Sequence, residues 1–225
     1  MKENKMHDIE VIVGGFMSID GKIAPDNRNG KEFMQFMTAR HKEMLHDIRA
    51  SVDAIVVGVD TVLADNPALT VRYVDGKNPL RIVLDNHAQT PLTAKILDTY
   101  QTPTLIATTK QASKEKIMSL KSRNIDVFIS SFEVVNLQEL LGALKERGVK
   151  RVLVEGGAKV RWSFFEANLV DELFVWIMPY VWGGKNAPTL VDGAGFLRAS
   201  EAKKLKLKSM EQVEGLVILW FSVES

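Results

Sequence analysis

Short runs of valine, isoleucine and leucine alternate along this chain with longer amphipathic stretches. A run that is apolar at every position predicts a strand buried on both faces, because a half-exposed strand would alternate polar and apolar residues. Alternation of such strands with helices favours a parallel sheet covered by helices on both faces. The runs that predict strands are residues 9–16, 54–58, 80–85, 104–108, 127–129, 151–155 and 172–178.

The helices expected between these strands are marked by apolar residues at helical spacing and by capping residues. Ser113 and Asn136 are expected N-caps, and Gly148 is expected to end the helix that follows Asn136. The expected helices cover residues 30–49, 113–123, 136–147 and 158–167.

The C-terminal tail has a different pattern. Residues 205–213 and 216–223 alternate like an antiparallel pair joined at Glu214 and Gly215. This pair makes the expected sheet mixed, although mostly parallel. Since no linker rich in proline, glycine or serine divides the chain, we expect a single domain over residues 1–225.

The composition excludes several classes of function. The 225 residues contain no cysteine, which excludes a disulfide framework, a thiolate nucleophile, an iron–sulfur cluster and a zinc site with cysteine ligands. The formal net charge of +1 at pH 7 gives no bulk reason to expect nucleic acid or an anionic membrane as a partner. No segment approaches the ~18 apolar residues of a membrane helix, and the polar N-terminus lacks a signal-peptide pattern. We therefore expect a soluble, cytoplasmic protein.

Residues 153–159 are the most informative segment for function. A buried strand ends at Glu155 and runs into Gly156 and Gly157, after which a helix is expected. Such a turn presents backbone N–H groups and the positive end of a helix, and it can bind a nucleotide pyrophosphate. The alternative is a tight strand-to-helix turn without a ligand. Glu155 stands where ligands bind in open parallel sheets, or else it pairs with a surface cation.

A second polar segment follows the strand that ends at Gly58. Thr61 and Asp65 are four residues apart, a spacing that puts a hydroxyl and a carboxylate on one side of a helical turn. The following Asn66-Pro67 ends that turn. These two side chains either face a ligand or form a capping turn.

Asp20 and the histidines are expected to serve the structure. Asp20-Gly21 follows the first strand and predicts a turn with a positive backbone angle at Gly21. No histidine belongs to a Ser–His–Asp pattern or to a paired-histidine metal motif, so we expect no catalytic histidine and no metal site. The four histidines are His7, His41, His46 and His87.

Taken together, several segments resemble the pyrimidine reductases of riboflavin biosynthesis, in particular those of the stand-alone archaeal and fungal type. The resemblance covers residues 8–224, and residues 61–72 are its most specific part. The family often has serine where this chain has Asn86. The matching segments, in chain order, are residues 18–24, Arg49 with Asp53, 61–72, 79–85, 153–157, 169–172 and 183–184.

The resemblance implies a dihydrofolate-reductase-like, three-layer α/β fold, NADPH as the hydride donor and a homodimer. It assigns Thr61 and Asp65 to the nicotinamide half of NADPH, and Asn86 to the adenosine side. The 2′-phosphate calls for a cation, for which Lys110 or Lys159 is a candidate. The pyrophosphate is assigned to the glycine turn, that is to Gly156, Gly157, Ala158 and Lys159.

The residues that match the family's substrate site are Arg49, Leu69, Arg72 and Glu155. Two arginines suit a ribose 5-phosphate, because guanidinium groups bind phosphate through charge-assisted, bidentate bonds. The implied reaction is hydride transfer to C1 of the ribosyl group of a phosphorylated diaminoribosylaminopyrimidine, once the sugar ring has opened to an imine. Glu155 is the nominee for the proton transfers, and the protein otherwise orients the reactants.

Three alternatives stay open at this point. The chain could act on the deaminated substrate of the bacterial order, although it has neither the cysteines nor the length for the zinc deaminase that accompanies bacterial homologues. It could be another reductase of the same fold, such as a dihydrofolate reductase that uses Glu32 or Glu43 as its acid. It could also be a nucleotide-binding regulatory module, which the joint presence of Arg49, Arg72 and Glu155 disfavours.

Overall fold

The structure is a computed structural model that describes residues 8–224, and these residues form two compact units. Three elements contribute residues to both units: β1 (Glu10–Ser18), α1 (Ala39–Ala50) and β6 (Arg151–Gly156). The single domain expected from the sequence stays a prediction. Unit 1 consists of residues 8–10 and 43–153, and unit 2 consists of residues 11–42 and 154–224.

Unit 1 contains, besides its parts of the shared elements, β2 (Ala54–Gly58), α2 (Val59–Asp65), β3 (Leu80–Leu84), η2 (Lys95–Leu97), β4 (Thr104–Thr109), α3 (Lys114–Lys121), β5 (Asp126–Ser130) and α4 (Leu137–Glu146). Its strand order is β5-β4-β3-β2-β6, and the pairings from β2 to β5 are parallel. β2 and β4 are buried along their whole length, as expected for central strands of a parallel sheet covered on both faces.

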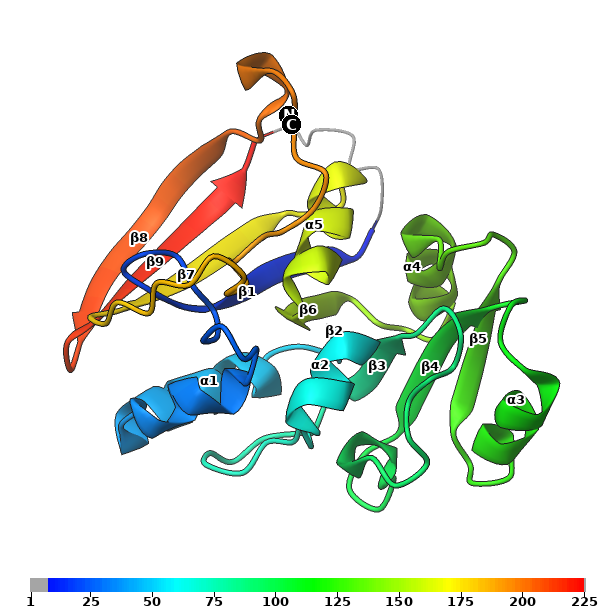
Figure 1. The fold of residues 1–225 in the computed structure, drawn as a ribbon. Helices are drawn as coiled ribbons and strands as arrows, with labels where there is room; N and C mark the ends of the chain where they lie inside the picture. Colours follow the sequence, from blue (N-terminus) through cyan, green and yellow to red (C-terminus); the bar gives the residue numbers. More distant parts are fainter. Residues whose placement is uncertain (1–7, 225) are drawn as a thin grey trace. The chain divides into compact units, whose positions relative to one another are not determined.

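Helices lie on both faces of the unit 1 sheet. The chain passes through β2, β3, β4 and β5 in one direction, so right-handed crossovers place α2 and α3 on one face. It then returns from β5 to β6 through α4, which the same rule places on the other face (Figure 1). Unit 1 is therefore a three-layer α/β arrangement. The buried side of α4 consists of Leu137, Leu140, Leu141 and Leu144.

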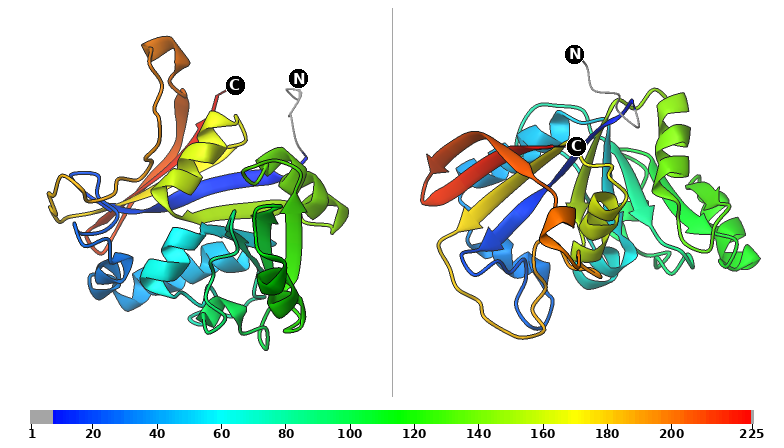
Figure 2. Two further views of the ribbon diagram at one scale, coloured as in Figure 1. Left: turned by 45° about the vertical axis from the view of Figure 1, so that its right-hand side comes forward. Right: turned by 90° about the horizontal axis from the view of Figure 1, so that it is seen from above.

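Unit 2 contains, besides its parts of the shared elements, η1 (Gly30–Gln35), α5 (Ala158–Glu166), β7 (Glu172–Met178), η3 (Ala199–Glu201), β8 (Leu205–Val213) and β9 (Leu216–Val223). Its strand order is β6-β1-β7-β9-β8. β1 pairs with β7 in parallel, whereas β9 is antiparallel to both β7 and β8 (Figure 2).

The hairpin turn between β8 and β9 is the two-residue turn that the sequence predicts. Glu214 and Gly215 have positive φ angles of 47° and 85°, which suit a turn whose twist matches that of the flanking strands. The expected mixed sheet, mostly parallel with an antiparallel hairpin at its C-terminal end, is confirmed.

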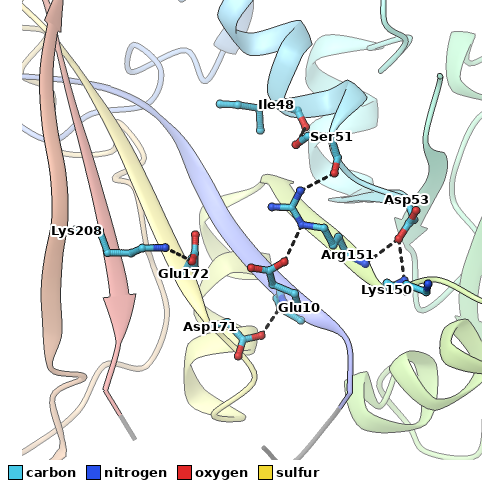
Figure 3. Close-up of polar contacts among 10 residues, drawn as sticks. Glu10, Ile48, Ser51, Asp53, Lys150, Arg151, Asp171, Glu172 and Lys208 are labelled. Atoms are coloured by element: carbon cyan, nitrogen blue, oxygen red, sulfur yellow. Dashed lines mark hydrogen bonds and ion pairs between the residues drawn. The ribbon is translucent and has the colours of Figure 1, made fainter. Parts of the chain in front are cut away.

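The first residue of β6 is fixed by a polar network inside unit 1 (Figure 3). Nε of Arg151 donates to Glu10 at 2.7 Å, and its Nη1 donates to the carbonyl oxygen of Ser51 at 2.7 Å. The Asp53 carboxylate accepts the backbone N–H groups of Lys150 and Arg151, at 2.8 and 2.9 Å. This network ties the beginnings of β1, β2 and β6 together.

The continuous helix expected over residues 30–49 is wrong, and the other expected elements are confirmed with small shifts at their ends. The segment divides into the short 3₁₀ helix η1 and the helix α1 that begins at Ala39. Thr38 explains the division, since its hydroxyl oxygen accepts the backbone N–H of His41 at 3.2 Å. A threonine in this position caps a new helix instead of continuing an old one.

Candidate active site

The two arginines expected to bind the substrate meet at one residue of unit 1. Arg49 lies in the last turn of α1 and is 7% exposed, and its Nη1 donates to the carbonyl oxygen of Thr70 at 3.5 Å. Arg72 is exposed, and its Nη1 donates to the Thr70 hydroxyl at 2.6 Å. Two guanidinium groups beside one threonine form a basic site in which a phosphate can accept charge-assisted hydrogen bonds.

The loop that carries Thr70 and Arg72 is shaped by two residues with left-handed backbone angles. Asn66, at φ 43°, ends α2, and its side-chain oxygen accepts the N–H of Lys95 at 2.8 Å. Leu69 has φ 51° and is buried. Positive φ is uncommon for leucine. Leu69 therefore shapes the loop through its backbone while its side chain packs in the interior.

The helical turn predicted for Thr61 and Asp65 is confirmed. Both lie on α2, one turn apart, and both side chains are partly exposed. Their assignment to a nicotinamide stays a prediction.

Asn86 follows β3 and is built into the loop structure there. Its side-chain oxygen accepts the N–H of Val135 at 3.0 Å. Its carbonyl oxygen accepts the hydroxyls of Thr108 and Thr109, at 3.1 and 2.9 Å. A contact between the Asn86 side chain and an adenosine would therefore involve its Nδ2 group.

The glycine turn of unit 2 has the backbone geometry that a phosphate ligand requires. Gly157 has φ 85°, a value that favours glycine, and it precedes α5 as an N-cap without a side-chain hydrogen bond. The first N–H groups of α5 are thus not capped by a side chain, and Lys159 is exposed in the first turn. These features fit the pyrophosphate of a dinucleotide.

Arg161 on α5 is a residue of this region that the sequence reasoning missed. It is 4% exposed, and its guanidinium donates to the carbonyl oxygens of Gly14, Leu190 and Glu155. Burial lowers the pKa of Arg161 to about 10, and the charge of Glu155 partly offsets this effect. Arg161 thus ties the end of β6 to β1. The signal in the sequence that could have identified Arg161 is its position on the apolar side of a short expected helix.

Asp20 forms the turn that was predicted and also clamps a second loop. Gly21 has φ 80°, as expected. The Asp20 carboxylate accepts the Ser18 hydroxyl and the backbone N–H groups of Trp182 and Gly183. The hydrogen bond from Ser18 is the largest effect on the pKa of Asp20 and lowers it. Burial, the next largest effect, opposes this shift, and the backbone hydrogen bonds of Gly183 and Trp182 add to the lowering, which brings the pKa to about 2.

Two of the histidines are buried and hold backbone groups. His41 lies with Nε2 2.9 Å from the carbonyl oxygen of Val213. Nδ1 of His46 accepts the backbone N–H of Arg72 at 2.8 Å. His87 is exposed, and His7 lies outside the described residues.

Three further observations concern the expected 2′-phosphate contact, metal ions and membranes. The two candidate cations for a 2′-phosphate, Lys110 and Lys159, are both exposed. Within residues 8–224, no group of three or more His, Asp or Glu side chains is arranged to hold a metal ion. No helix in this part of the chain is long and apolar enough to span a bilayer.

Parallel strands with helices on both faces in unit 1, together with the mixed sheet of unit 2, define this chain as an α/β protein. The family model of the RibD C-terminal domain matches residues 10–219. This chain therefore belongs to the RibD C-terminal domain family, a family of oxidoreductases of riboflavin biosynthesis.

Two curated relatives match most of the chain and carry the same name, 2,5-diamino-6-ribosylamino-4(3H)-pyrimidinone 5′-phosphate reductase. The relative from Aquifex aeolicus is 42% identical over 200 residues, which cover 88% of this chain and 89% of the relative. The relative from Methanothermobacter thermautotrophicus is 37% identical over 201 residues, 88% of this chain and 90% of the relative. RibD of Actinobacillus pleuropneumoniae is 35% identical, and this chain spans only 55% of its length.

Solved structures share the fold. RibD of Acinetobacter baumannii matches 96% of this chain with a TM-score of 0.80 and 25% identity, and this chain spans 58% of that protein. The riboflavin biosynthesis reductase Rib7 of Saccharomyces cerevisiae matches the whole chain with a TM-score of 0.72 and 23% identity, over 93% of its own length. The fold class expected from the sequence is therefore confirmed.

Proposed function

We propose that this chain reduces the ribosyl group of 2,5-diamino-6-ribosylamino-4(3H)-pyrimidinone 5′-phosphate to a ribitylamino group, with NADPH as the reductant. The observation that carries the proposal is the pair of guanidinium groups beside Thr70, in a chain 42% identical to a relative named for that substrate. The proposal includes a homodimeric state, which the family resemblance implies, and a cytoplasmic location.

The substrate's phosphate is assigned to the basic site of unit 1. Arg49 is held in place by burial, whereas Arg72 is exposed and can close on a ligand. Leu69 contributes through the backbone of the same loop. Glu155, at the end of β6, is assigned to the amino groups of the pyrimidine, since a carboxylate accepts hydrogen bonds from such donors.

The cofactor is assigned to residues that fit its parts chemically. Thr61 and Asp65 are assigned to the nicotinamide side, and Asn86 to the adenosine side. The pyrophosphate is assigned to Gly156, Gly157, Ala158 and Lys159, where backbone N–H groups at the start of α5 suit an anion.

The reaction needs an acceptor double bond, which a closed ribosyl ring lacks. Ring opening moves a proton from the exocyclic nitrogen to the ring oxygen and leaves an imine between C1 and nitrogen. Reduced nicotinamide, when bound, supplies the hydride that C1 accepts. A proton then adds to the nitrogen and completes the amine. We assign these proton transfers to Glu155, and we assign the orientation of the sugar to the two arginines.

Two alternatives can be compared with particular observations. The deaminated substrate is the first, but the diamino reductases from Aquifex and Methanothermobacter are 42% and 37% identical, against 35% for the Actinobacillus RibD. Dihydrofolate reduction is the second. Of its two candidate acids, Glu32 lies in η1, not on a long helix, and its carboxylate accepts hydrogen bonds from Asn29 and Gln35. The other candidate, Glu43, lies on α1.

The test follows NADPH absorbance after the diamino substrate is added to purified protein. We expect oxidation by the wild type, a raised KM for NADPH in Asp65→Ala, and a kcat lowered by ~10²-fold or more in Glu155→Gln. The exposed Asp75 supplies the control, since Asp75→Asn should change neither constant. Absence of oxidation would contradict the proposal. Full turnover of Glu155→Gln with weaker substrate binding would give Glu155 a binding role only.

A further inference from the structure

His46 is a completely buried histidine of α1, and its position beside both candidate phosphate-binding arginines calls for a role. Its exposed fraction is 0%, and its ring and that of Tyr73 form a T-shaped pair with the ring centroids 4.8 Å apart. Both neighbours of interest, Arg49 and Arg72, belong to unit 1, as His46 does. The sequence suggested only that His46 takes no part in catalysis.

The hydrogen bond at Nδ1 fixes the tautomer of a neutral His46. Nδ1 accepts the backbone N–H of Arg72 at 2.8 Å, so in this state it carries no proton. A neutral imidazole must then carry its proton on Nε2. His46 therefore acts as an acceptor toward the loop that carries Arg72.

The other ring nitrogen faces the second arginine. Nε2 of His46 lies 3.5 Å from Nη1 of Arg49, and the same Nη1 lies 3.5 Å from the carbonyl oxygen of Thr70. Nη1 always carries hydrogens, and Nε2 carries one in this tautomer, so two donors lie side by side. His46 therefore lies directly against the buried guanidinium of Arg49.

We propose that His46 is a positioning residue for the substrate's phosphate. Its Nδ1 fixes the backbone of Arg72, and its Nε2 lies beside Nη1 of Arg49. This inference rests on the proposed function, because it assigns the phosphate of that substrate to Arg49 and Arg72. The role proposed for His46 involves neither the hydride transfer nor the pyrimidine ring. The role is specific to the phosphate, so loss of His46 should spare the chemistry at C1.

The experiment compares the phosphorylated substrate with the same compound lacking the 5′-phosphate. Steady-state NADPH oxidation is measured with the wild type and with His46→Leu, His46→Asn and His46→Gln. We expect His46→Leu to raise KM for the phosphorylated substrate by ~10-fold or more, with kcat within about twofold and no change for the unphosphorylated compound. Asparagine places an oxygen near the position of Nδ1, so the KM of His46→Asn for the phosphorylated substrate should return most of the way to the wild-type value. The KM of His46→Gln should stay raised.

His41 supplies the matched control, because it lies on the same helix and is buried but contacts Val213 instead of the arginines. His41→Asn should leave the preference for the phosphorylated substrate unchanged. An unaltered preference in His46→Leu would overturn the inference, as would equal behaviour of His46→Asn and His46→Gln. If His46→Leu does not fold, the difference in KM for the phosphorylated substrate between His46→Asn and His46→Gln tests the inference instead. Wild-type protein without any turnover would instead overturn the proposed function.

Discussion

Backbone groups, more than other side chains, hold the charged residues that this chain buries. Arg81 is 1% exposed, and its guanidinium donates to the carbonyl oxygens of Ala68, Asp98 and Thr102. The buried Asp85 carboxylate accepts the N–H groups of Gln89 and Thr90. Since a buried charge without partners is costly, these bonds make each charge compatible with the interior and fix the loops that supply them.

Asp20 gives the residue-scale prediction, because its pKa is lowered from 3.8 to about 2 chiefly by the Ser18 hydroxyl. A carboxylate with a lowered pKa adds stability above its unfolded pKa and loses that contribution as the pH falls through its folded pKa. Urea unfolding should therefore show wild type more stable than Asp20→Asn at pH 5, with the difference shrinking from pH 4 toward 2.

The exposed Asp75 is the control for this experiment, and Asp75→Asn should alter neither the stability nor its pH dependence. A difference between wild type and Asp20→Asn that stays constant down to pH 2 would argue against the clamp between the two loops.

At the scale of elements, the glycine turn and the strands beside it depend on one buried arginine. Arg161 bridges Gly14 of β1 and Glu155 of β6, and a side chain on Gly15 would come within 2.5 Å of its Nη2. This close approach accounts for glycine at position 15, whereas a side chain on Gly14 would meet the ring of Phe174. Arg161 therefore positions the turn that we assign to the pyrophosphate.

Replacement of Arg161 by leucine should lower the free energy of unfolding by at least ~1–3 kcal/mol, because buried carbonyl oxygens lose their donor. The same change should weaken NADPH binding in a fluorescence titration. Arg147→Leu is the matched control: its exposed ion pair with Asp126 should contribute ~0–1 kcal/mol. Equal effects of the two substitutions would contradict the bridging role.

The caps of α3 and α4 give a second prediction at this scale. The side chain of Asn136 accepts the N–H of Glu139 at 2.9 Å, and that of Ser113 accepts the N–H of Lys116 at 3.1 Å. Asn136→Ala and Ser113→Ala should each lower the free energy of unfolding by ~0.5–2 kcal/mol in chemical denaturation. Unchanged stability in both variants would contradict the capping.

The local sequence pattern predicted most helices, strands and turns, whereas contacts between residues far apart in the sequence could not be predicted from it. Both caps, the left-handed Gly21 and the helical turn of Thr61 and Asp65 depend on residues a few positions apart, so they could be predicted. Arg161 finds its partner Gly14 across 147 positions, and no periodicity encodes that contact. His46 bonds to Arg72 across 26 positions in the same way.

The break in the predicted helix over residues 30–49 has a different cause. The apolar residues there keep a helical spacing across the break, so the pattern alone predicts one helix. The Thr38 hydroxyl, which accepts the N–H of His41, decides the start of α1. Cap chemistry therefore outweighed periodicity in this segment.

At the scale of the whole molecule, each unit contains some of the residues to which we assign a role. Unit 1 supplies the arginines and α2, and unit 2 supplies Glu155 and the glycine turn. The relatives named for the diamino substrate match about nine-tenths of both chains, as the 88% and 89% coverage of the Aquifex relative illustrates.

The most direct test of the central claim is to follow the hydride. NADPH carrying deuterium at both C4 positions is supplied with the diamino substrate, and the product is analysed by mass spectrometry and NMR. The account predicts one deuterium per product molecule, on C1 of the ribityl chain. A product without deuterium, or with deuterium on any other carbon, would contradict it.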